Sequence, residues 1–230
     1  MKFSENTADV ISGTYNSTES IAGKQILVQK IHVVDSAAPV VETNIRIVDA
    51  DSSLKAVVDL ADDINIDSAE ATQSFMLTYN KSTGNVDLTF GGIKQAVASS
   101  VPTRIYNMKD DEAVDTLSPM GGGDNAQLTI NGNGYKVSTD GGNGITVENT
   151  QKLNIKDITM EGFSTAITNN NGGEVNITDS TFTGNNIDVH NEGALNIKPT
   201  EDNTVVFNSV IEDNPTAKSG VLTVDGLGAV

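Results

Sequence analysis

The stretch from Gly144 to Lys198 repeats itself, and this repeat constrains the fold more than any other feature of the sequence. GITVENTQKLNIKDITMEG is followed 22 residues later by AITNNNGGEVNITDSTFTG, and Ile187 of IDVHNEGALNIK lies 20 residues after Ile167. Four columns of residues align across the three copies: Ile145, Ile167 and Ile187; Asn149, Asn171 and Asn191; Leu153, Val175 and Leu195; Ile155, Ile177 and Ile197. A fixed period near 20 residues is the mark of a repeat architecture.

Within each copy, apolar residues alternate with polar ones, as in strands rather than helices. Ile145 and Val147 alternate with Thr146 and Glu148, and Gly-Gly, Asn-Gly and Asn-Asn pairs interrupt the runs. A unit this short cannot bury its own apolar face, so it stacks on its neighbours about 4.7–4.9 Å away. The sequence therefore predicts an all-β fold, a parallel β-helix (solenoid) whose Ile, Leu and Val ladders fill the inside.

The alternation places eight strands in the repeat. They are expected at residues 144–148, 152–156 and 158–161, then at 166–169, 174–178 and 180–183, then at 187–190 and 194–198. Asn149, Asn171 and Asn191 would lie at a turn, where stacked amides can hydrogen-bond along the ladder.

The region before the repeat is β-rich but has no visible 22-residue register before Gln127. We expect a hairpin over Phe75–Phe90, a short helix over Ile93–Val101 ended by Pro102, a strand over Thr103–Tyr106 and an acidic loop over Asp110–Pro119. Residues 1–120 are accordingly assigned to a less regular β-rich region, which is either a set of irregular early rungs or a capping domain. Residues 121–230 are assigned to the β-helix.

The period loosens after Lys198. The expected elements are an insertion, a strand, a loop and a resumed strand, at Pro199–Asn203, Thr204–Ser209, Asp213–Gly220 and Val221–Val224. Phe207 would take the column of Met160 and Phe182. Because the pattern stops without an amphipathic cap, we expect the chain to be a piece of a longer protein, truncated at its C-terminus.

The composition narrows the classes of partner. The formal net charge of −17 repels nucleic acid and anionic lipid, so neither is expected to bind. Without cysteine the chain has no disulfides, no thiolate catalysis and no Cys-ligated zinc. No apolar run is long enough for a membrane-spanning helix, and the first residues carry no apolar signal core.

The run Leu128–Phe163, LTINGNGYKVSTDGGNGITVENTQKLNIKDITMEGF, resembles the passenger domains of autotransporters and related type V secreted adhesins of Gram-negative bacteria. The tail NTVVFNS…GVLTVDGLGAV is similar to the same family. The resemblance implies a right-handed β-helix that is exported to the bacterial cell surface or secreted. Such passengers mediate attachment, biofilm formation and virulence. The chain departs from a complete family member in lacking a signal peptide and a membrane barrel, as an excised fragment would.

Outward polar columns are the candidate interaction face, for a ligand or for self-association. Its members are Asn154, Asn176, Asn196, Thr159 and Thr181. A solvated β-face without a ligand gives the same pattern.

Two aspartates and a histidine are the other candidates. Asp157 and Asp179 would stack on adjacent rungs, where two carboxylates can share a proton or hold calcium, although a turn-capping role explains them equally. His190 aligns with Glu148 and Asn170 as an outward rung residue. No catalytic, cofactor-binding or metal-binding residue is assigned, and no cofactor is expected.

Two function classes fit a β-helix: a non-catalytic adhesin that attaches to host cells or to other bacterial cells, and a polysaccharide lyase or hydrolase. Lyases of uronates need basic residues, and hydrolases need converging carboxylates. No arginine follows Arg104, the outward acids are scattered and there is no tryptophan. The sequence therefore favours the adhesin, with a host receptor, a glycan or another copy of itself as the partner.

Overall fold

The computed structural model describes residues 11–12, 26–32, 44–49, 58–67, 71–80, 85–117, 119–201, 203–213 and 221–224. By its internal contacts the chain divides into two compact units, Met1–Gly91 and Gly92–Val230. The expected loop Asp213–Gly220 lies almost wholly outside the described residues.

The first unit contains six described strands: β1 (Ile11–Ser12), β2 (Ile26–His32), β3 (Asn44–Asp49), β4 (Val58–Asp67), β5 (Phe75–Asn80) and β6 (Asn85–Phe90). β2 pairs with β4, and β1 with β3, in parallel, whereas β6 runs antiparallel to both β3 and β5. The β5–β6 pair, from Phe75 opposite Phe90 to Asn80 opposite Asn85, confirms the predicted hairpin.

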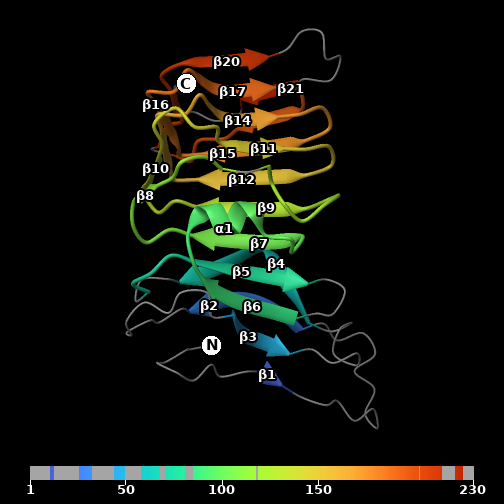
Figure 1. Ribbon diagram of the computed structural model, residues 1–230. Helices are drawn as coiled ribbons and strands as arrows, with labels where there is room; N and C mark the ends of the chain where they lie inside the picture. The colour runs from blue at the N-terminus through green and yellow to red at the C-terminus, as the bar shows by residue number, and fades with distance from the viewer. Residues whose placement is uncertain are drawn as a thin grey trace. The chain divides into compact units, whose positions relative to one another are not determined.

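The second unit is a parallel β-helix, as the sequence predicted, of about five turns. Its first sheet consists of β7 (Thr103–Asn107), β9 (Gln127–Asn131), β12 (Lys152–Lys156), β15 (Glu174–Thr178), β18 (Ala194–Ile197) and β21 (Val221–Val224). The second sheet consists of β8 (Glu112–Ala113), β10 (Lys136–Ser138), β13 (Thr159–Glu161), β16 (Thr181–Thr183) and β19 (Val206–Phe207). The third consists of β11 (Ile145–Val147), β14 (Thr165–Asn169), β17 (Ile187–Asn191) and β20 (Val210–Asp213), stacked one above the other in Figure 1.

Apolar side chains of equivalent strands form continuous buried columns inside the solenoid. Ile155, Ile177 and Ile197 are at most 1% exposed and are register partners along the first sheet, as are Leu153, Val175 and Leu195. Burying a side chain of this size stabilises a fold by about 1.5–3 kcal/mol. The alternation of these columns with polar residues is therefore what fixes the register of the sheet.

The strands expected from the repeat are all present, and their ends differ from the prediction by at most one residue. Beyond the repeat, Phe207 is the register partner of Phe182, which in turn pairs with Met160. The rings of Phe182 and Phe207 stack with centroids 5.0 Å apart. β21 pairs with β18, so the resumed strand is confirmed as well.

Two columns were aligned wrongly on the third sheet. Ile145 and Ile167 are partners, but the next residue in that column is Val189 rather than Ile187. The amide column likewise runs through Val147, Asn169 and Asn191, and not through Asn149, Asn171 and Asn191.

The cause of this error is a difference in turn length. Residues 170–173 join β14 to β15, whereas only residues 192–193 join β17 to β18. The third copy is therefore two residues short at a corner, and not over its whole length. Strands on either side of the corner keep their register because ladder pairing fixes them independently.

The stack begins earlier than the sequence indicated. β7 pairs with β9 from Thr103 opposite Gln127, and β8 pairs with β10 from Glu112 opposite Val137. The region expected to be an acidic loop thus holds a strand, and Pro119 forms a parallel bridge with Thr146. Residues 103–113 therefore form early turns of the solenoid, which was one of the two alternatives for the region 1–120.

A short helix, α1 (Ile93–Ala98), packs against this first turn, at the position that the sequence predicted. Arg104 of β7 is 1% exposed and donates to the backbone oxygens of Ala96 (2.7 Å), Val97 (3.0 Å), Val101 (2.9 Å) and Gly121 (3.1 Å). Burial lowers the pKa of Arg104 to about 10, so the guanidinium remains charged at neutral pH. In the first turn Arg104 occupies the position of the leucine column, opposite Leu128. Its hydrogen bonds to Ala96 and Val97 hold the C-terminal half of α1 against β7.

Candidate interaction face

Three of the five candidate residues form one continuous ladder on the outer side of the first sheet. Asn196 Nδ2 donates to Asn176 Oδ1 (2.9 Å), and Asn176 Nδ2 donates to Asn154 Oδ1 (2.8 Å). The ladder ends where Asn154 Nδ2 donates to Thr129 Oγ1 (3.1 Å). We call Thr129, Asn154, Asn176 and Asn196 the outer amide ladder. Each amide still has hydrogen-bonding capacity toward solvent, since an asparagine carries two N–H donors and two oxygen lone pairs.

A charged pair borders this ladder. Glu174 Oε1 accepts from Asn176 Nδ2 (3.0 Å) and lies 2.9 Å from Lys152 Nζ. Partial burial acts to raise the pKa of the Glu174 carboxyl, but the hydrogen bonds from Asn176 and Lys152 and the charge of Lys152 outweigh it and lower the pKa. The carboxylate is therefore ionised at neutral pH and helps to orient the Asn176 amide.

Thr159 and Thr181 lie on the second sheet instead, where they are register partners in β13 and β16. The five candidates are thus divided between two sheets, three on one and two on the other. On the second sheet the neighbouring charged groups, Lys136 Nζ and Glu161 Oε2, form an ion pair of 3.2 Å. Asn208 Nδ2 donates to Thr183 Oγ1 (3.1 Å) farther along the same sheet.

Asp157 and Asp179 occupy the turns between the first and second sheets, with φ of 51° and 50°. Asparagine and aspartate tolerate this left-handed conformation better than other residues with a side chain. Asp179 accepts from Thr200 N (2.7 Å) and from Thr200 Oγ1 (2.7 Å), so both of its oxygens organise the following turn. Within the described part of the chain, no group of three or more His, Asp or Glu side chains is arranged to hold a metal ion.

His190 lies on the third sheet between two carboxylates. Its Nδ1 is 3.1 Å from Glu212 Oε2, and its Nε2 is 3.6 Å from Glu192 Oε1. Its register partner in the preceding turn is Thr168, and not Asn170 as the sequence alignment had it. The contact with Glu212 ties β17 to β20.

A second amide pair lies inside the solenoid. Asn169 and Asn191 are fully buried, and Asn169 Nδ2 donates both to Asn191 Oδ1 (2.8 Å) and to Ala194 O (3.0 Å). The residue below Asn169 in the same column is Val147, which offers no donor. Asn169 Oδ1 consequently has no hydrogen-bond partner among the described residues.

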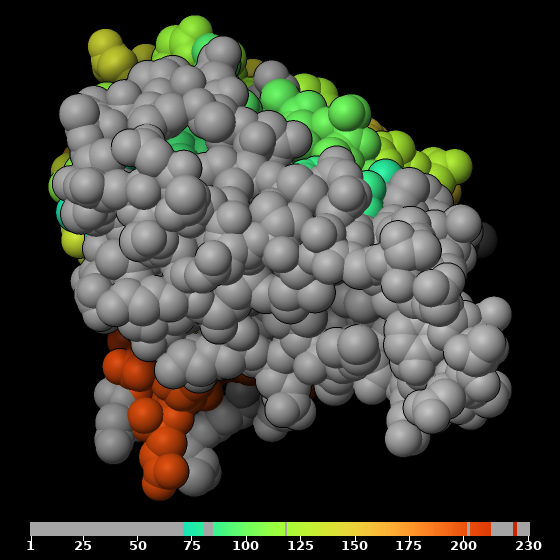
Figure 2. All heavy atoms as spheres, turned by 90° about the horizontal axis from the view of Figure 1, so that it is seen from below, coloured from blue at the N-terminus to red at the C-terminus, as the bar shows by residue number. Residues whose placement is uncertain are grey.

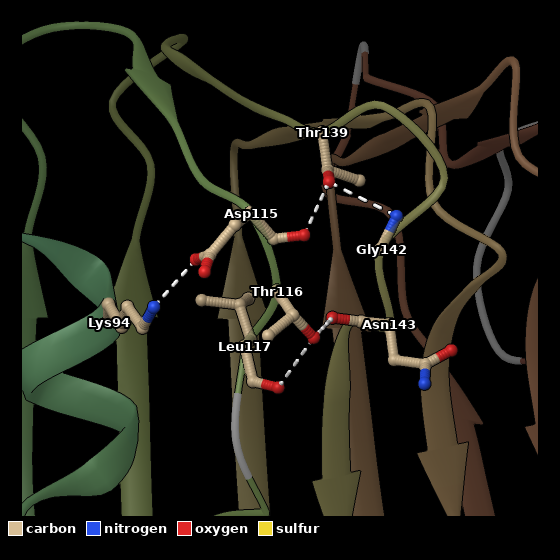
Figure 3. A network of polar contacts seen from close by, with 7 residues as sticks. All are labelled: Lys94, Asp115, Thr116, Leu117, Thr139, Gly142 and Asn143. Atoms are coloured by element: carbon tan, nitrogen blue, oxygen red, sulfur yellow. Dashed lines mark hydrogen bonds and ion pairs between the residues drawn. The ribbon is translucent and has the colours of Figure 1, made fainter.

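A polar network connects α1 to the first two turns (Figure 3). Lys94 Nζ donates to Asp115 Oδ1 (2.6 Å), and this hydrogen bond is the main cause of a lowered pKa of the Asp115 carboxyl. Thr139 Oγ1 donates to Asp115 O (2.9 Å), and Thr116 Oγ1 donates to Asn143 O (3.0 Å). In Figure 2 the green atoms of the α1 region and the orange-red atoms of residues 203–213 lie at opposite edges of the view.

Thr129 and Glu174 were missed as members of the outer face. Thr129 lies 25 residues before Asn154, and the sequence search for a 22-residue step passed over it. A search that allowed two extra residues after Asn131 and one after Ser138 would have found it. Glu174 had a signal as well, because it stands opposite Lys152 in the aligned repeat.

Comparison of the chain with protein families, with curated proteins and with solved structures gave no match. In the part of the chain that is described, no helix has the length and hydrophobicity that crossing a membrane requires.

Proposed function

We propose that this chain is a non-catalytic adhesive module of a bacterial cell surface, which attaches to a host receptor, to a glycan or to another copy of itself. The observation that carries the proposal is the outer amide ladder, which presents hydrogen-bonding groups at the spacing of the rungs. Because the ladder bonds fix the amides to one another, a ligand meets a face that is already ordered, and less entropy is lost on binding.

The wider setting belongs to the same proposal. A passenger of the type V secreted class, exposed on or released from the cell, is supported by the sequence resemblance over Leu128–Phe163. A role in biofilm formation and virulence follows from that class.

Binding to such a face is expected to be weak at a single site. The flanking groups are polar and the ladder has no aromatic member, so little apolar area is removed from water on contact. Many copies on one cell would supply strength through avidity.

The proposal is tested with beads that carry the folded chain. Beads coated with the parent chain should bind a glycan array, host cells or one another, and beads coated with Asn154→Lys, Asn196→Lys should lose most of that binding. The matched control is Thr159→Lys, Thr181→Lys, which adds the same charge on the second sheet. Loss of binding in the control but not in the ladder variant would move the contact surface to the second sheet, and binding by none of the three would overturn the proposal.

The competing enzyme hypothesis has its own assay. We expect no product from polygalacturonate or other common polysaccharides, with or without calcium. Turnover that disappears in an Asp157→Asn, Asp179→Asn variant would replace the adhesive proposal with a catalytic one.

Self-association has a distinct salt signature. Two chains of formal charge −17 repel each other, and added salt screens that repulsion. Homotypic contact should therefore strengthen as the salt concentration rises, which sedimentation at high protein concentration can measure. A strict monomer at both low and high salt would leave a host ligand or a glycan as the partner.

A further inference from the structure

The chain contains four Asn-Gly dipeptides, at Asn131, Asn133, Asn143 and Asn171. In an Asn-Gly pair the glycine amide nitrogen can attack the asparagine side chain, because glycine has no Cβ to hinder the approach. The reaction needs an amide nitrogen that is free to reach the side-chain carbon. Hydrogen bonding of each glycine therefore separates reactive pairs from inert ones.

Three of the four glycine nitrogens are held in the solenoid. Each donates a hydrogen bond to a carbonyl oxygen of the following turn: Gly132 N to Lys156 O (2.8 Å), Gly134 N to Asp157 O (2.8 Å) and Gly144 N to Thr165 O (2.8 Å). Attack by any of them requires this bond to break first, and local opening of a packed turn costs free energy.

Gly172 differs from the other three glycines. Both Gly172 and Asn171 are exposed, and the Gly172 nitrogen has no hydrogen-bond partner among the described residues. Its carbonyl oxygen accepts from Thr150 N (3.0 Å) in the turn below, which keeps the segment in place.

The short corner of the next turn explains why this nitrogen is not covered. That turn crosses from β17 to β18 with two residues, and its Glu192 N and Ala194 N bond to the oxygens of Asn169 (2.7 Å) and Gly173 (2.9 Å). None of these contacts involves the Gly172 nitrogen. The two-residue difference that shifted the sequence alignment thus coincides with the one glycine nitrogen of the four that has no ladder hydrogen bond.

We propose that Asn171 is a covalent modification site, at which Gly172 converts the asparagine to aspartate and isoaspartate in the folded protein. The Gly172 nitrogen forms a bond to Asn171 Cγ and loses its proton to solvent base, while the Cγ–Nδ2 bond breaks and ammonia leaves. Water then adds to either carbonyl of the resulting succinimide ring and opens it. The net change is asparagine plus water to an acid plus ammonia, with no oxidant or reductant.

The product alters the corner in two ways. Each conversion adds one negative charge to a chain whose formal net charge is −17. The isoaspartate form also carries the backbone through the side chain, which lengthens the turn between β14 and β15 by one atom.

The test follows the four sites within one sample. The folded chain is incubated at mildly alkaline pH, and peptide mapping by mass spectrometry quantifies the acid and isoacid forms at each asparagine over time. We expect Asn171 to convert at least about tenfold faster than each of the other three asparagines. A tenfold difference in rate corresponds to only ~1.4 kcal/mol of protection by the ladder hydrogen bonds. In urea, where the ladder is gone, the four rates should converge.

Two further samples complete the experiment. Asn171→Gln should remove the fast conversion and the matching acidic shift on ion exchange, because glutamine closes the larger ring slowly, while the other three sites keep their rates. The proposal would be overturned if Asn171 converted no faster than Asn131 in the folded parent chain. It would also be overturned if exposed Asn143 converted fastest.

Discussion

Two amide ladders of the same chemistry stand in different surroundings in this solenoid. The outer amide ladder is half-buried, so solvent can reach it, and it ends on the Thr129 hydroxyl. The inner pair, Asn169 and Asn191, is fully buried and ends on Val147, which leaves Asn169 Oδ1 without a partner among the described residues. The amide–amide hydrogen bonds have similar lengths, 2.8 and 2.9 Å in the outer ladder and 2.8 Å in the inner pair, so the difference lies in burial and in what terminates each ladder.

The comparison teaches that burial, and not the hydrogen bond itself, decides what an asparagine contributes. A buried amide that loses its partner costs about 1–3 kcal/mol per unsatisfied group, whereas an exposed amide is satisfied by water. The inner pair is therefore committed to the fold, and the outer ladder is available for contacts with other molecules.

The largest difference in stability is expected between a charge placed on the inward side of a strand and the same charge placed on its outward side. Ile177→Asp places a charge in the buried column, while Thr178→Asp places it on the outer side of the same strand. The first should cost about 4–5 kcal/mol, and the second should change stability by less than about 0.5 kcal/mol. Thermal melts of the two variants measure the difference, and equal melting temperatures would mean that the register is wrong.

A smaller effect should separate the two ladders themselves. Asn169→Ala removes the donor to Asn191 Oδ1 and to Ala194 O, so it should cost about 2–4 kcal/mol. Asn176→Ala interrupts the outer ladder, where water replaces the lost partners, and should cost no more than about 1 kcal/mol. Denaturant unfolding gives both values, and an outer variant as damaging as the inner one would break the comparison.

The smallest effect is a pH dependence confined to the outer face. The pKa of the Glu174 carboxyl is lowered in the folded chain, so its contribution to stability is present above the unfolded pKa and is lost as the pH falls through the folded pKa. Because the pair with Lys152 is partly exposed, the contribution should stay below about 1 kcal/mol. Glu174→Gln should flatten the stability profile on the acid side of pH 4.5, the ordinary value, and an unchanged slope there would contradict the assignment.

The sequence predicted the first sheet well because its columns follow one rule. Leu153, Val175 and Leu195 are apolar at the same place in each copy, and polar neighbours flank them, so the alternation alone fixes the register. The outer asparagines followed from the same rule, since residues between two inward positions face out.

The third sheet and the early turns did not follow from the sequence, for different reasons. Ile187 matched Ile167 in type, so the similarity of the two isoleucines concealed a deletion at the next corner. In the first turn, Arg104 occupies an inward column where the pattern calls for an apolar residue. Its cost is offset by carbonyl oxygens of α1 and of Gly121, which no local pattern reveals.

The sequence placed Asn154 and Thr159 on separate strands, but it did not show that these strands belong to different sheets. Asn154 and Thr159 are only five residues apart, and the alternation of polar and apolar residues gives no angle between the two strands. The turn at Asp157, with its positive φ, redirects the chain onto the second sheet. Such a bend is set by backbone conformation and by contact with neighbouring turns, which polar alternation does not report.

Unequal corners have a consequence for how a gene of this kind can change. The strands hold their columns through pairing above and below, while the corner between the third and first sheets has four residues in one turn and two in the next. In-frame insertions and deletions at that corner are absorbed without moving a core residue, as is common for exposed loop tips. Over generations the number of residues in each turn of the solenoid should change at the corners, while the apolar residues of its interior columns stay under selection.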